Sequence, residues 1–333
     1  MRHVYGSLLG AALLLVGATA GARAAAPVEV GYMPIIPDAQ AFVVLGGETA
    51  ANPLAKTHLV EFQDGPAIVQ ALLAGQLDVA YVGIGPAMVA RTKGADIRIV
   101  ASNIVDQINL LALGDLAPYF ADGEPATAFA RFAAAKGRKP VITTFARGST
   151  PAAVLEHWLK DVAHVDPASY RIVYQGAAQA QQALLVGAVD AATVPEPAAS
   201  IVMARRPGAK IVVPGSRMFP DQPGAVLVVR QRLIDRDPTY VQELVDAQVA
   251  ATRLLNEQPQ KVLPAVQKYV GGGRLPANVV LAALRRSHFE ANPHRILAST
   301  QRMRDFQVQT GVLKGKLDVT RLFDTRFYDH VGE

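Results

Sequence analysis

Two segments of this chain repeat one another, and this repeat constrains the fold more than any other feature. Residues 70–87 read QALLAGQLDVAYVGIGPA and residues 182–199 read QALLVGAVDAATVPEPAA, with the same residue at half of the aligned positions. Each copy reads as the end of a helix, a glycine stop, a short strand and a Gly/Pro loop that opens the next helix. A unit that recurs only once is too sparse for a solenoid. The repeat therefore predicts two similar α/β lobes with a cleft between them.

The first residues have the features of a secretory signal peptide. Arg2 and His3 precede a small and apolar run from Leu8 to Gly21, and Ala22-Arg23-Ala24 then gives the small-x-small pattern of a signal-peptidase site. Residues 1–24 are therefore expected to be removed, with an uncleaved N-terminal anchor as the alternative. The chain has no cysteine, which excludes a lipobox anchor, disulfide bonds and thiol-based sites. Export without cysteine points to a soluble protein of a bacterial periplasm.

The distribution of charge gives no sign of a nucleic-acid partner. The formal net charge of +5 falls to +3 when Arg2 and Arg23 leave with the signal peptide, and the other Lys and Arg residues are scattered among acids. A nucleic-acid surface would cluster them with aromatic residues, so solvated helix faces are expected instead. The 309 residues that remain (333 minus 24) are enough for two lobes with substantial cores.

Strand-like and helix-like segments alternate along most of the chain. Strand patterns cover residues 28–32, 58–62, 78–82, 97–101, 141–144, 170–174, 191–194 and 211–213. Helix patterns cover residues 39–45, 66–74, 86–93, 126–135, 151–162, 178–186 and 197–204. This βαβα order predicts an α/β fold with parallel sheets covered by helices. From Asp235 onward the pattern is mostly helical, and we expect this tail to pack on the first lobe.

Two segments have the character of hinge crossings between the lobes. Residues 214–220, PGSRMFP, are rich in chain breakers, and the strand-like segment 225–230 that follows would return to the first lobe. The other crossing is expected near residues 109–116. These positions divide the mature chain into lobe I, residues 25–113 and 218–333, and lobe II, residues 114–217.

Four helices are expected to begin with a proline directly after a strand, two in each lobe. Pro66, Pro86, Pro151 and Pro197 have this position, where the missing N–H costs nothing because it would be unpaired anyway. Ligands of open α/β sheets bind at the carboxyl ends of the strands, and each helix start carries unpaired N–H groups and a partial positive charge. Four such ends facing one cleft would bind a small anionic or polar ligand. The alternative is that they are only good helix starts.

The loop Phe145–Pro151 has the strongest binding pattern of the four. Arg147 offers a forked cationic donor, Gly148 lets the backbone approach closely, and Ser149 and Thr150 add hydroxyl groups. We expect Thr150 to be the N-cap of the helix that follows. This set suits a carboxylate, sulfonate or phosphonate, and the alternative is an Arg147 that only faces solvent.

Glu196 stands in the matching loop of the second repeat, where the first repeat has Ile84. A carboxylate aimed into the cleft would favour an amine or a hydroxyl on the ligand, or would pair with Arg147. A neutral or zwitterionic heterocycle held by Glu196 is thus the alternative to an anion held by Arg147. Glu196 could equally be an exposed acid that supports the helix dipole.

Several segments carry motifs that occur together, in this order, in a known family. Residues 28–34, VEVGYMP, are similar to its opening GY-x-P strand, and residues 71–80, ALLAGQLDVA, to its helix-Gly-x-x-Asp-strand signature. Gly83–Pro86 is similar to the cleft loop that follows, Gly148-Ser149-Thr150 to the anchor loop of lobe two, and Glu196-Pro197 to an EP pair after its last strand. The chain thus resembles the periplasmic solute-binding proteins of the nitrate/sulfonate/taurine type, which are related to the thiamine-precursor binders.

The resemblance implies a type II periplasmic-binding fold, with two α/β lobes, a ligand cleft and a helical C-terminal tail. It also implies a monomer that delivers a small-molecule ligand to an ABC permease in the inner membrane. We expect no metal, no cofactor and no nucleic acid. Together with the cleft loops, it points to a ligand-binding set of Met33, Pro34, Asp38, Gln40, Gly65, Gly83, Ile84, Gly85, Ser102, Asn103, Arg147, Gly148, Ser149, Thr150, Gln175, Pro195 and Glu196.

The ligand expected from the sequence is a small organic anion such as a sulfonate or carboxylate. Members of the family also take nitrate, pyrimidines, aromatic acids and larger cofactor-like compounds. Sulfonate binders often carry an aromatic residue in the loop that here reads Val194-Pro195-Glu196, and this chain has none there. In the first loop, Asp38 or Gln40 would face the cleft where relatives place different polar groups.

An enzyme and a sensor receptor are the two alternatives to transport. A thiamine-pyrimidine-synthase-like enzyme would, by the same resemblance, use a histidine and a cysteine-rich iron-site motif, and this chain lacks cysteine. Ser149 has no evident catalytic base, because His157 lies two turns along the next helix, and no pair of the seven histidines has metal-ligand spacing. A receptor that presents its ligand to a membrane sensor would have the same sequence features.

Overall fold

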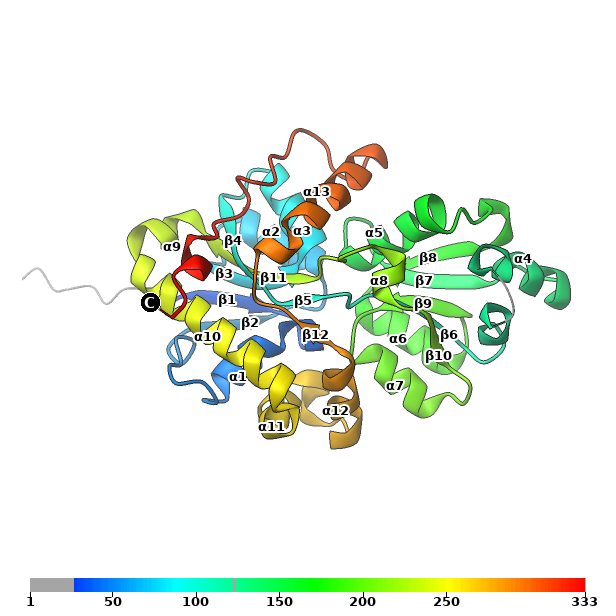
Figure 1. Cartoon of the computed structure of the whole chain (residues 1–333), viewed down its shortest axis with the longest axis horizontal. Coiled ribbons are helices and arrows are strands. Elements are labelled where there is room, and N and C mark those ends of the chain that lie inside the picture. The colour runs from blue at the N-terminus through cyan, green and yellow to red at the C-terminus, as the bar shows by residue number, and fades with distance from the viewer. Residues whose placement is uncertain (1–26, 122–123, 333) are drawn as a thin grey trace, which may run out of the picture.

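The computed structural model describes residues 27–121 and 124–332 of the chain. The predicted signal peptide, residues 1–24, lies outside the described residues. Within these ranges the chain forms two lobes, each built on a five-stranded sheet with helices on both faces (Figure 1). None of the helices in the described ranges combines the length and the apolar character that crossing a lipid bilayer requires.

The two sheets have matching strand orders. The sheet of lobe I has the order β2-β1-β3-β11-β4, and that of lobe II, read from the opposite edge, has the order β8-β7-β9-β6-β10. The strands of lobe I are β1 (Glu29–Tyr32), β2 (His58–Glu61), β3 (Val79–Gly83), β4 (Ile97–Ser102) and β11 (Ala225–Arg230). Those of lobe II are β6 (Asn109–Ala112), β7 (Val141–Phe145), β8 (Arg171–Gln175), β9 (Ala191–Val194) and β10 (Lys210–Val213).

The α-helices are α1 (Ala39–Leu45), α2 (Gly65–Leu73), α3 (Ile84–Thr92), α4 (Pro125–Lys136), α5 (Thr150–His157), α6 (Ala177–Val186), α7 (Ala198–Arg205), α8 (Gly215–Met218), α9 (Gln231–Arg236), α10 (Pro238–Glu257), α11 (Pro259–Tyr269), α12 (Ala277–Arg286), α13 (His294–Gln309) and α14 (Arg326–Asp329). The predicted helices begin and end within two residues of these bounds, except that α5 ends at His157 rather than at residue 162. The short helices α8, α9 and α14 were not predicted. A π-helical turn, Trp158–Val162, extends α5. A separate two-stranded antiparallel sheet pairs β5 (Ile104–Val105) with β12 (His288–Phe289).

The sheets are mixed, so the prediction of purely parallel sheets was wrong for one strand in each lobe. β11 runs antiparallel to β3 and β4, and β6 runs antiparallel to β9 and β10. Both strands enter their sheet directly from the other lobe, without the helical crossover that a parallel neighbour in the same sheet requires. Because β6 belongs to the second sheet, the chain leaves lobe I before Asn109, several residues ahead of the predicted boundary at residue 113.

The two crossings between the lobes lie side by side and are held together by Gln222. Its fully buried amide accepts a hydrogen bond from the Ile108 N–H (2.7 Å) and donates to the carbonyls of Ile108 (3.0 Å) and Gly215 (3.1 Å). The backbone N–H of Gln222 donates to the Asp106 carboxylate (3.2 Å), and its carbonyl accepts from the Asp106 N–H (3.1 Å). A Cβ at Gly215 would lie 2.6 Å from the Asp106 carbonyl oxygen, so this approach requires glycine.

The sequence repeat corresponds to equivalent positions in the two lobes. The segment α2-β3-α3 of lobe I matches α6-β9-α7 of lobe II, and β3 and β9 are the central strands of their sheets. The repeated glycines, Gly75 and Gly187, both have φ +74°, a left-handed conformation that suits glycine after a helix.

The repeated aspartates have the same structural role in both lobes. Asp78 accepts a hydrogen bond from the N–H of Glu29, which begins β1, and Asp190 accepts one from Val141, which begins β7 (3.2 and 2.8 Å). An arginine pairs with each carboxylate, with Arg138 binding both oxygens of Asp190 at 2.7 Å. These aspartates lie at the amino ends of β1 and β7, away from the cleft, and fix the start of the neighbouring strand.

The C-terminal helices pack on lobe I and also touch lobe II. α10 lies along α1, and α11 packs on α1 and α12. α12 contacts α7, and α13 contacts α5, both of which belong to lobe II. The helical tail therefore covers one lobe, as predicted, and in addition reaches across the cleft to the other (Figure 1).

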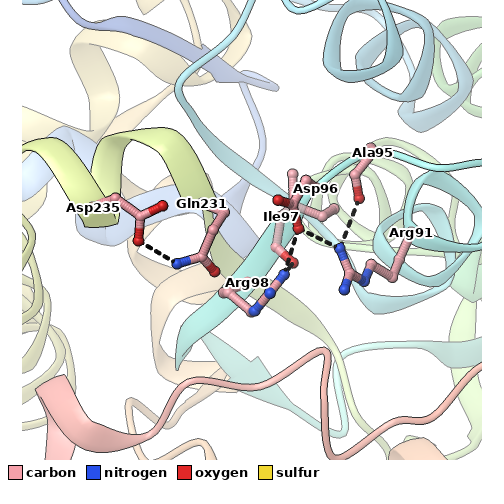
Figure 2. Close-up of polar contacts among 7 residues, drawn as sticks. All are labelled: Arg91, Ala95, Asp96, Ile97, Arg98, Gln231 and Asp235. Atoms are coloured by element: carbon pink, nitrogen blue, oxygen red, sulfur yellow. Dashed lines mark hydrogen bonds and ion pairs between the residues drawn. The ribbon is translucent and has the colours of Figure 1, made fainter.

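A polar cluster fixes the turn between α3 and β4 on the outer side of lobe I. Figure 2 shows Asp96 accepting hydrogen bonds from Arg91 (2.6 Å) and Arg98 (2.9 Å). The Asp96 carbonyl also accepts from the N–H of Gln231, the first residue of α9 (2.9 Å). The cluster joins the end of the first repeat to the start of the C-terminal helices.

We expect Asp190→Ala to lower the free energy of unfolding by about 1–3 kcal/mol, the usual cost of a buried hydrogen-bond donor left without a partner. The variant leaves the Val141 N–H unpaired at the start of β7. Urea denaturation followed by circular dichroism measures the change. Glu243→Ala, which removes an exposed acid from α10, is the control, and equal losses in the two variants would contradict the structural role of Asp190.

Candidate functional site

A cavity of about 440 Å³, its open mouth included, lies between the two lobes. It is located where β1, β3, β7 and β9 end, which is the edge of an open α/β sheet that binds ligands. Residues from both lobes and from one crossing enclose it. The described residues that line it are Met33, Ile35, Pro37, Asp38, Gly65, Val82, Gly83, Pro86, Gln107, Ile108, Phe145, Ser149, Thr150, Pro151, Pro195 and Ala225.

The four loops with prolines at helix starts do meet at this cavity. The N-cap of α5, however, is not the predicted residue. Ser149, rather than Thr150, is the N-cap of α5 and accepts a hydrogen bond from the Ala152 N–H (3.3 Å). Asp64 caps α2 by accepting from the Ala67 N–H (2.9 Å). α2 and α5 begin one residue before their prolines, α3 begins two residues before Pro86, and α7 begins directly after Pro197.

The lobes touch each other at the edge of the cavity. The Gly85 N–H donates to the Thr150 hydroxyl (3.3 Å), and the Ile36 N–H donates to the Glu196 carbonyl (3.1 Å). A Cβ at Gly85 would lie only 2.7 Å from the carbonyl oxygen of Gly148. Glycine at position 85 therefore allows the two backbones to approach this closely.

Asp38 is a buried acid in the cavity wall. It ends a 3-10 turn that leads from β1 into α1, and its side chain is 1% exposed. One carboxylate oxygen, Oδ2, accepts a hydrogen bond from the Met33 N–H (2.9 Å), whereas Oδ1 has no partner among the described residues. Burial raises the pKa of Asp38 well above its usual value, against the opposing effect of the Met33 hydrogen bond.

Gln107 is a second polar wall residue, which the sequence analysis did not identify. It lies on the crossing from β5 to β6, is 8% exposed, and its Oε1 has no partner among the described residues. No motif marks this position, because its place at the cavity follows from the path of the crossing. Phe145 was also missed as a wall residue, although its position at the end of β7 is a usable signal.

Arg147 does not line this cavity. Its guanidinium lies over the Tyr174 ring (5.1 Å to the centroid), donates to the Tyr174 hydroxyl (3.3 Å) and is 3.6 Å from the Glu156 carboxylate. The side chain is 62% exposed and borders a separate hollow at the rim, together with Gly148 and Lys93. Partners on α5 and β8 therefore hold it at the rim, outside the cavity.

Glu196 also points away from the cavity, and it does not pair with Arg147. Its Oε2 accepts a hydrogen bond from the Ser200 N–H (2.9 Å) in the first turn of α7, and its Oε1 is 3.3 Å from an Nη of Arg286. Arg286 also donates to the Ser200 hydroxyl (2.7 Å). Because Arg286 ends α12, the contact links the C-terminal tail to lobe II.

Three other predicted binding residues lie in the interior of lobe I. Gln40 donates to the carbonyl of Asn103 (2.6 Å) and to the Thr252 hydroxyl (3.2 Å), and Asn103 donates to the carbonyl of Pro37 (3.2 Å). Ser102 is fully buried in β4, where its carbonyl accepts from Gln248 (3.0 Å). These side chains support the wall from behind and do not face the cavity.

The remaining predicted residues lie around the cavity edge or outside it. Pro34 borders a neighbouring hollow of the same cleft, which it shares with Pro195. Ile84 is fully buried in the core of lobe I, and Gln175 ends β8 outside the cavity wall. Of the predicted set, the structure brings together at the cavity Met33, Asp38, Gly65, Gly83, Ser149, Thr150 and Pro195.

No group of three or more His, Cys, Asp or Glu side chains in the described ranges is arranged to hold a metal ion. His157 is held between Phe219 and Phe306 (ring centroids 4.6 and 5.2 Å away) and is 3.1 Å from Asp161. It therefore belongs to the packing between α5, the second crossing and α13 rather than to the cavity wall.

Comparison with known proteins supports the same fold. The model of the NMT1-like family matches residues 21–267. A ligand-binding component of an ABC-type import system from Staphylococcus aureus, solved with zinc bound, has a TM-score of 0.74 at 18% identity, covering 92% of this chain and 98% of that chain. A search of curated proteins finds no match.

Two further solved structures have the same architecture. The alkanesulfonate-binding protein SsuA from Xanthomonas axonopodis pv. citri, bound to MOPS, has a TM-score of 0.69 at 18% identity, covering 90% of this chain and 98% of that chain. The periplasmic nitrate-binding protein NrtA from Synechocystis PCC 6803 has a TM-score of 0.73 at 13% identity, covering 91% and 87%. The two-lobed architecture is thus the type II periplasmic-binding fold.

The corrected cap of α5 gives a direct test. Ser149→Ala should lower the free energy of unfolding by about 1 kcal/mol, because it removes the N-cap. Thr150→Val should cost less, because it leaves the cap in place and removes only the hydroxyl that reaches Gly85. Urea denaturation without ligand compares the two, and a larger loss in Thr150→Val would restore Thr150 as the cap.

Proposed function

The chain belongs to the NMT1-like family, and on that basis we propose that it is the substrate-binding component of an ABC importer. It captures a small organic ligand in the cavity between its lobes and delivers it to a permease in the inner membrane. The protein acts in the periplasm, as a monomer and without a cofactor.

The observation that carries this proposal is the cavity that both lobes enclose. Loops of lobe I contribute Gly65 and Pro86, and loops of lobe II contribute Thr150 and Pro195. A site divided between two lobes holds its ligand only when the lobes are together, so binding and closure become one event. A permease can recognise the closed form, because closure changes the relative position of the lobes.

The solved structures with the same fold support this role, since they are ligand-binding proteins. Their reported ligands include zinc, MOPS and nitrate, and identities of 13–18% carry none of these to this chain. The described residues contain no metal-ligand cluster, so a metal is not proposed. The sulfonate or carboxylate favoured by the sequence would have to bind without Arg147, which is outside the cavity.

Binding without catalysis fits the wall residues better than an enzyme does. Nucleophilic catalysis needs a hydroxyl next to a positioned base. The Ser149 hydroxyl is the cap of α5, and His157 packs against Phe219 and Phe306. A receptor that presents its ligand to a membrane sensor would use the same cavity, and loss of ligand uptake on deletion of the gene distinguishes transport from sensing.

Ligand addition should raise the melting temperature and bring the lobes closer together. A thermal-shift screen of amines, carboxylates, sulfonates, phosphonates and pyrimidines identifies binders, because a ligand that binds only the folded state stabilises it.

Closure can be measured with a pair of spin labels, one on each lobe. Gln70 and Gln182 are exposed and occupy equivalent positions on α2 and α6, and because the chain lacks cysteine, a cysteine introduced at each position is labelled specifically. Spin labels at these two positions, as cysteines, should show a shorter or narrower distance distribution with a binder, and an unchanged distribution would contradict closure.

Gly85→Ala should weaken ligand binding at least tenfold without unfolding lobe I. Alanine is a better helix former than glycine in α3, yet its Cβ would lie 2.7 Å from the Gly148 carbonyl oxygen across the cleft. Calorimetry measures the affinity, and the Gln70/Gln182 label pair measures closure. Glu243→Ala, which changes an exposed residue of α10, is the control, and full affinity in Gly85→Ala would rule out the close approach of these loops in the bound state.

A further inference from the structure

Two buried side-chain oxygens of the cavity wall have no hydrogen-bond partner among the described residues. These atoms are Asp38 Oδ1 and Gln107 Oε1. Buried polar atoms in folded proteins are nearly always hydrogen-bonded. The two oxygens come from different segments, the first turn after β1 and the crossing into lobe II, and they share one cavity.

The wall has no cation to satisfy these oxygens or to hold an anion. Among the described lining residues there is no Lys, Arg or His. The cation expected there from the sequence, Arg147, is held at the rim, outside the cavity, by Tyr174 and Glu156. A carboxylate or sulfonate in the cavity would lie beside a buried acid with no arginine or lysine in the wall to offset it.

The rest of the wall is largely apolar and offers hydroxyl groups on one side. Ile108, Phe145 and Pro151 form much of its surface. Ser149 and Thr150 already accept backbone hydrogen bonds from Ala152 and Gly85, so their hydroxyl protons are available to an acceptor. A ligand that fits this wall has an apolar body and a donor group that reaches Asp38.

From this arrangement we propose that the cavity binds an organic amine or amidine, whose N–H groups donate to Asp38 Oδ1 and to Gln107 Oε1. The inference rests on the proposed function and names the ligand class of that same cavity. Asp38 becomes the counter-charge of the bound cation, and the Met33 N–H holds its other oxygen in place. The ionised carboxylate would repel an anion in the same position.

Binding of such a cation has a characteristic dependence on pH. Burial holds the pKa of Asp38 high in the free protein, so below that pKa a proton must leave Asp38 when the cation binds. Affinity therefore rises with pH up to the pKa of the free protein, and it is lost as the pH falls. Tyr81 on β3 also interacts with Asp38, but burial raises its pKa far above neutral, so it does not contribute to this slope.

The first experiment is a thermal-shift screen with matched pairs on one carbon skeleton, such as benzylamine and benzamidine against benzoate and benzenesulfonate, extended to aliphatic amines and their matched acids. The inference expects stabilisation by amines or amidines and none by the acids. Stabilisation by the acids would overturn the inference and leave the proposed function standing. No stabiliser in either class would count against the proposed function itself, and the inference would fall with it.

The second experiment uses the best amine or amidine and calorimetry in two buffers of different ionisation enthalpy. Wild type should release up to one proton on binding, with affinity rising up to tenfold per pH unit below the pKa of Asp38. Asp38→Asn keeps an acceptor for the Met33 N–H, and should lose at least tenfold in affinity together with the pH slope. Affinity that falls with rising pH would mean that Asp38 donates to an acceptor, and would overturn the inference.

Two further variants keep the test decisive if Asp38→Asn does not fold. Gln107→Met preserves the shape of the side chain but removes the amide, and should weaken the same amine severalfold. Arg147→Gln changes a charge outside the cavity and should leave its affinity unchanged. Loss of affinity in Arg147→Gln with full affinity in Gln107→Met would assign the ligand to the rim and overturn the inference.

Discussion

The amide of Gln222 holds together the two segments on which the two-lobed architecture depends. The crossings deliver β6 into the sheet of lobe II and β11 into the sheet of lobe I, and the sheet of lobe I is complete only after the chain has returned from lobe II. Gln222 pairs with Ile108 through both its donor and its acceptor, much as a strand neighbour would. These bonds join the crossings into one unit, and we propose it as the hinge for closure of the lobes. The same unit carries Gln107 to the cavity, which places the hinge and the binding wall on adjacent residues.

Much of this fold could be predicted because its determinants are local. The repeated Gly-x-x-Asp unit predicted two equivalent lobes, and the structure gives Gly75 and Gly187 the same φ and gives Asp78 and Asp190 the same role at the start of a strand. Strand direction could not be predicted, because β6 and β11 are short apolar runs like their neighbours. What sets their direction is the path of the chain between lobes, which is a tertiary property. The boundary near residue 113 was misplaced for the same reason.

The site shows the same division between local and tertiary determinants. Glycines, prolines and hydroxyls at strand ends are placed by the backbone, and the loops that contain them do meet at one cavity. Long charged side chains are placed by partners elsewhere in the sequence: Arg147 by Tyr174 and Glu156, and Glu196 by Arg286, ninety residues away. Both had been expected to face the ligand, and both instead tie structural elements together. A loop motif therefore predicts where a site is located more reliably than it predicts the charge of its wall.

One buried carboxylate oxygen of Asp38 has no partner among the described residues, and the same is true of the amide oxygens of Gln40 and Gln248. Gln40, Asn103, Gln248 and Thr252 are also buried, one layer behind the wall, and they donate hydrogen bonds to one another and to backbone carbonyls. This network comes within one residue of Asp38, since Asn103 donates to the carbonyl of Pro37, yet it supplies Asp38 with no donor. A carboxyl group retained only for stability would be better served by joining that network, because an unpaired buried acid costs free energy. Asp38 differs from these amides in two respects: it borders the cavity, and it carries a negative charge when ionised. A bound molecule with a donor group is therefore the partner that we propose for its free oxygen.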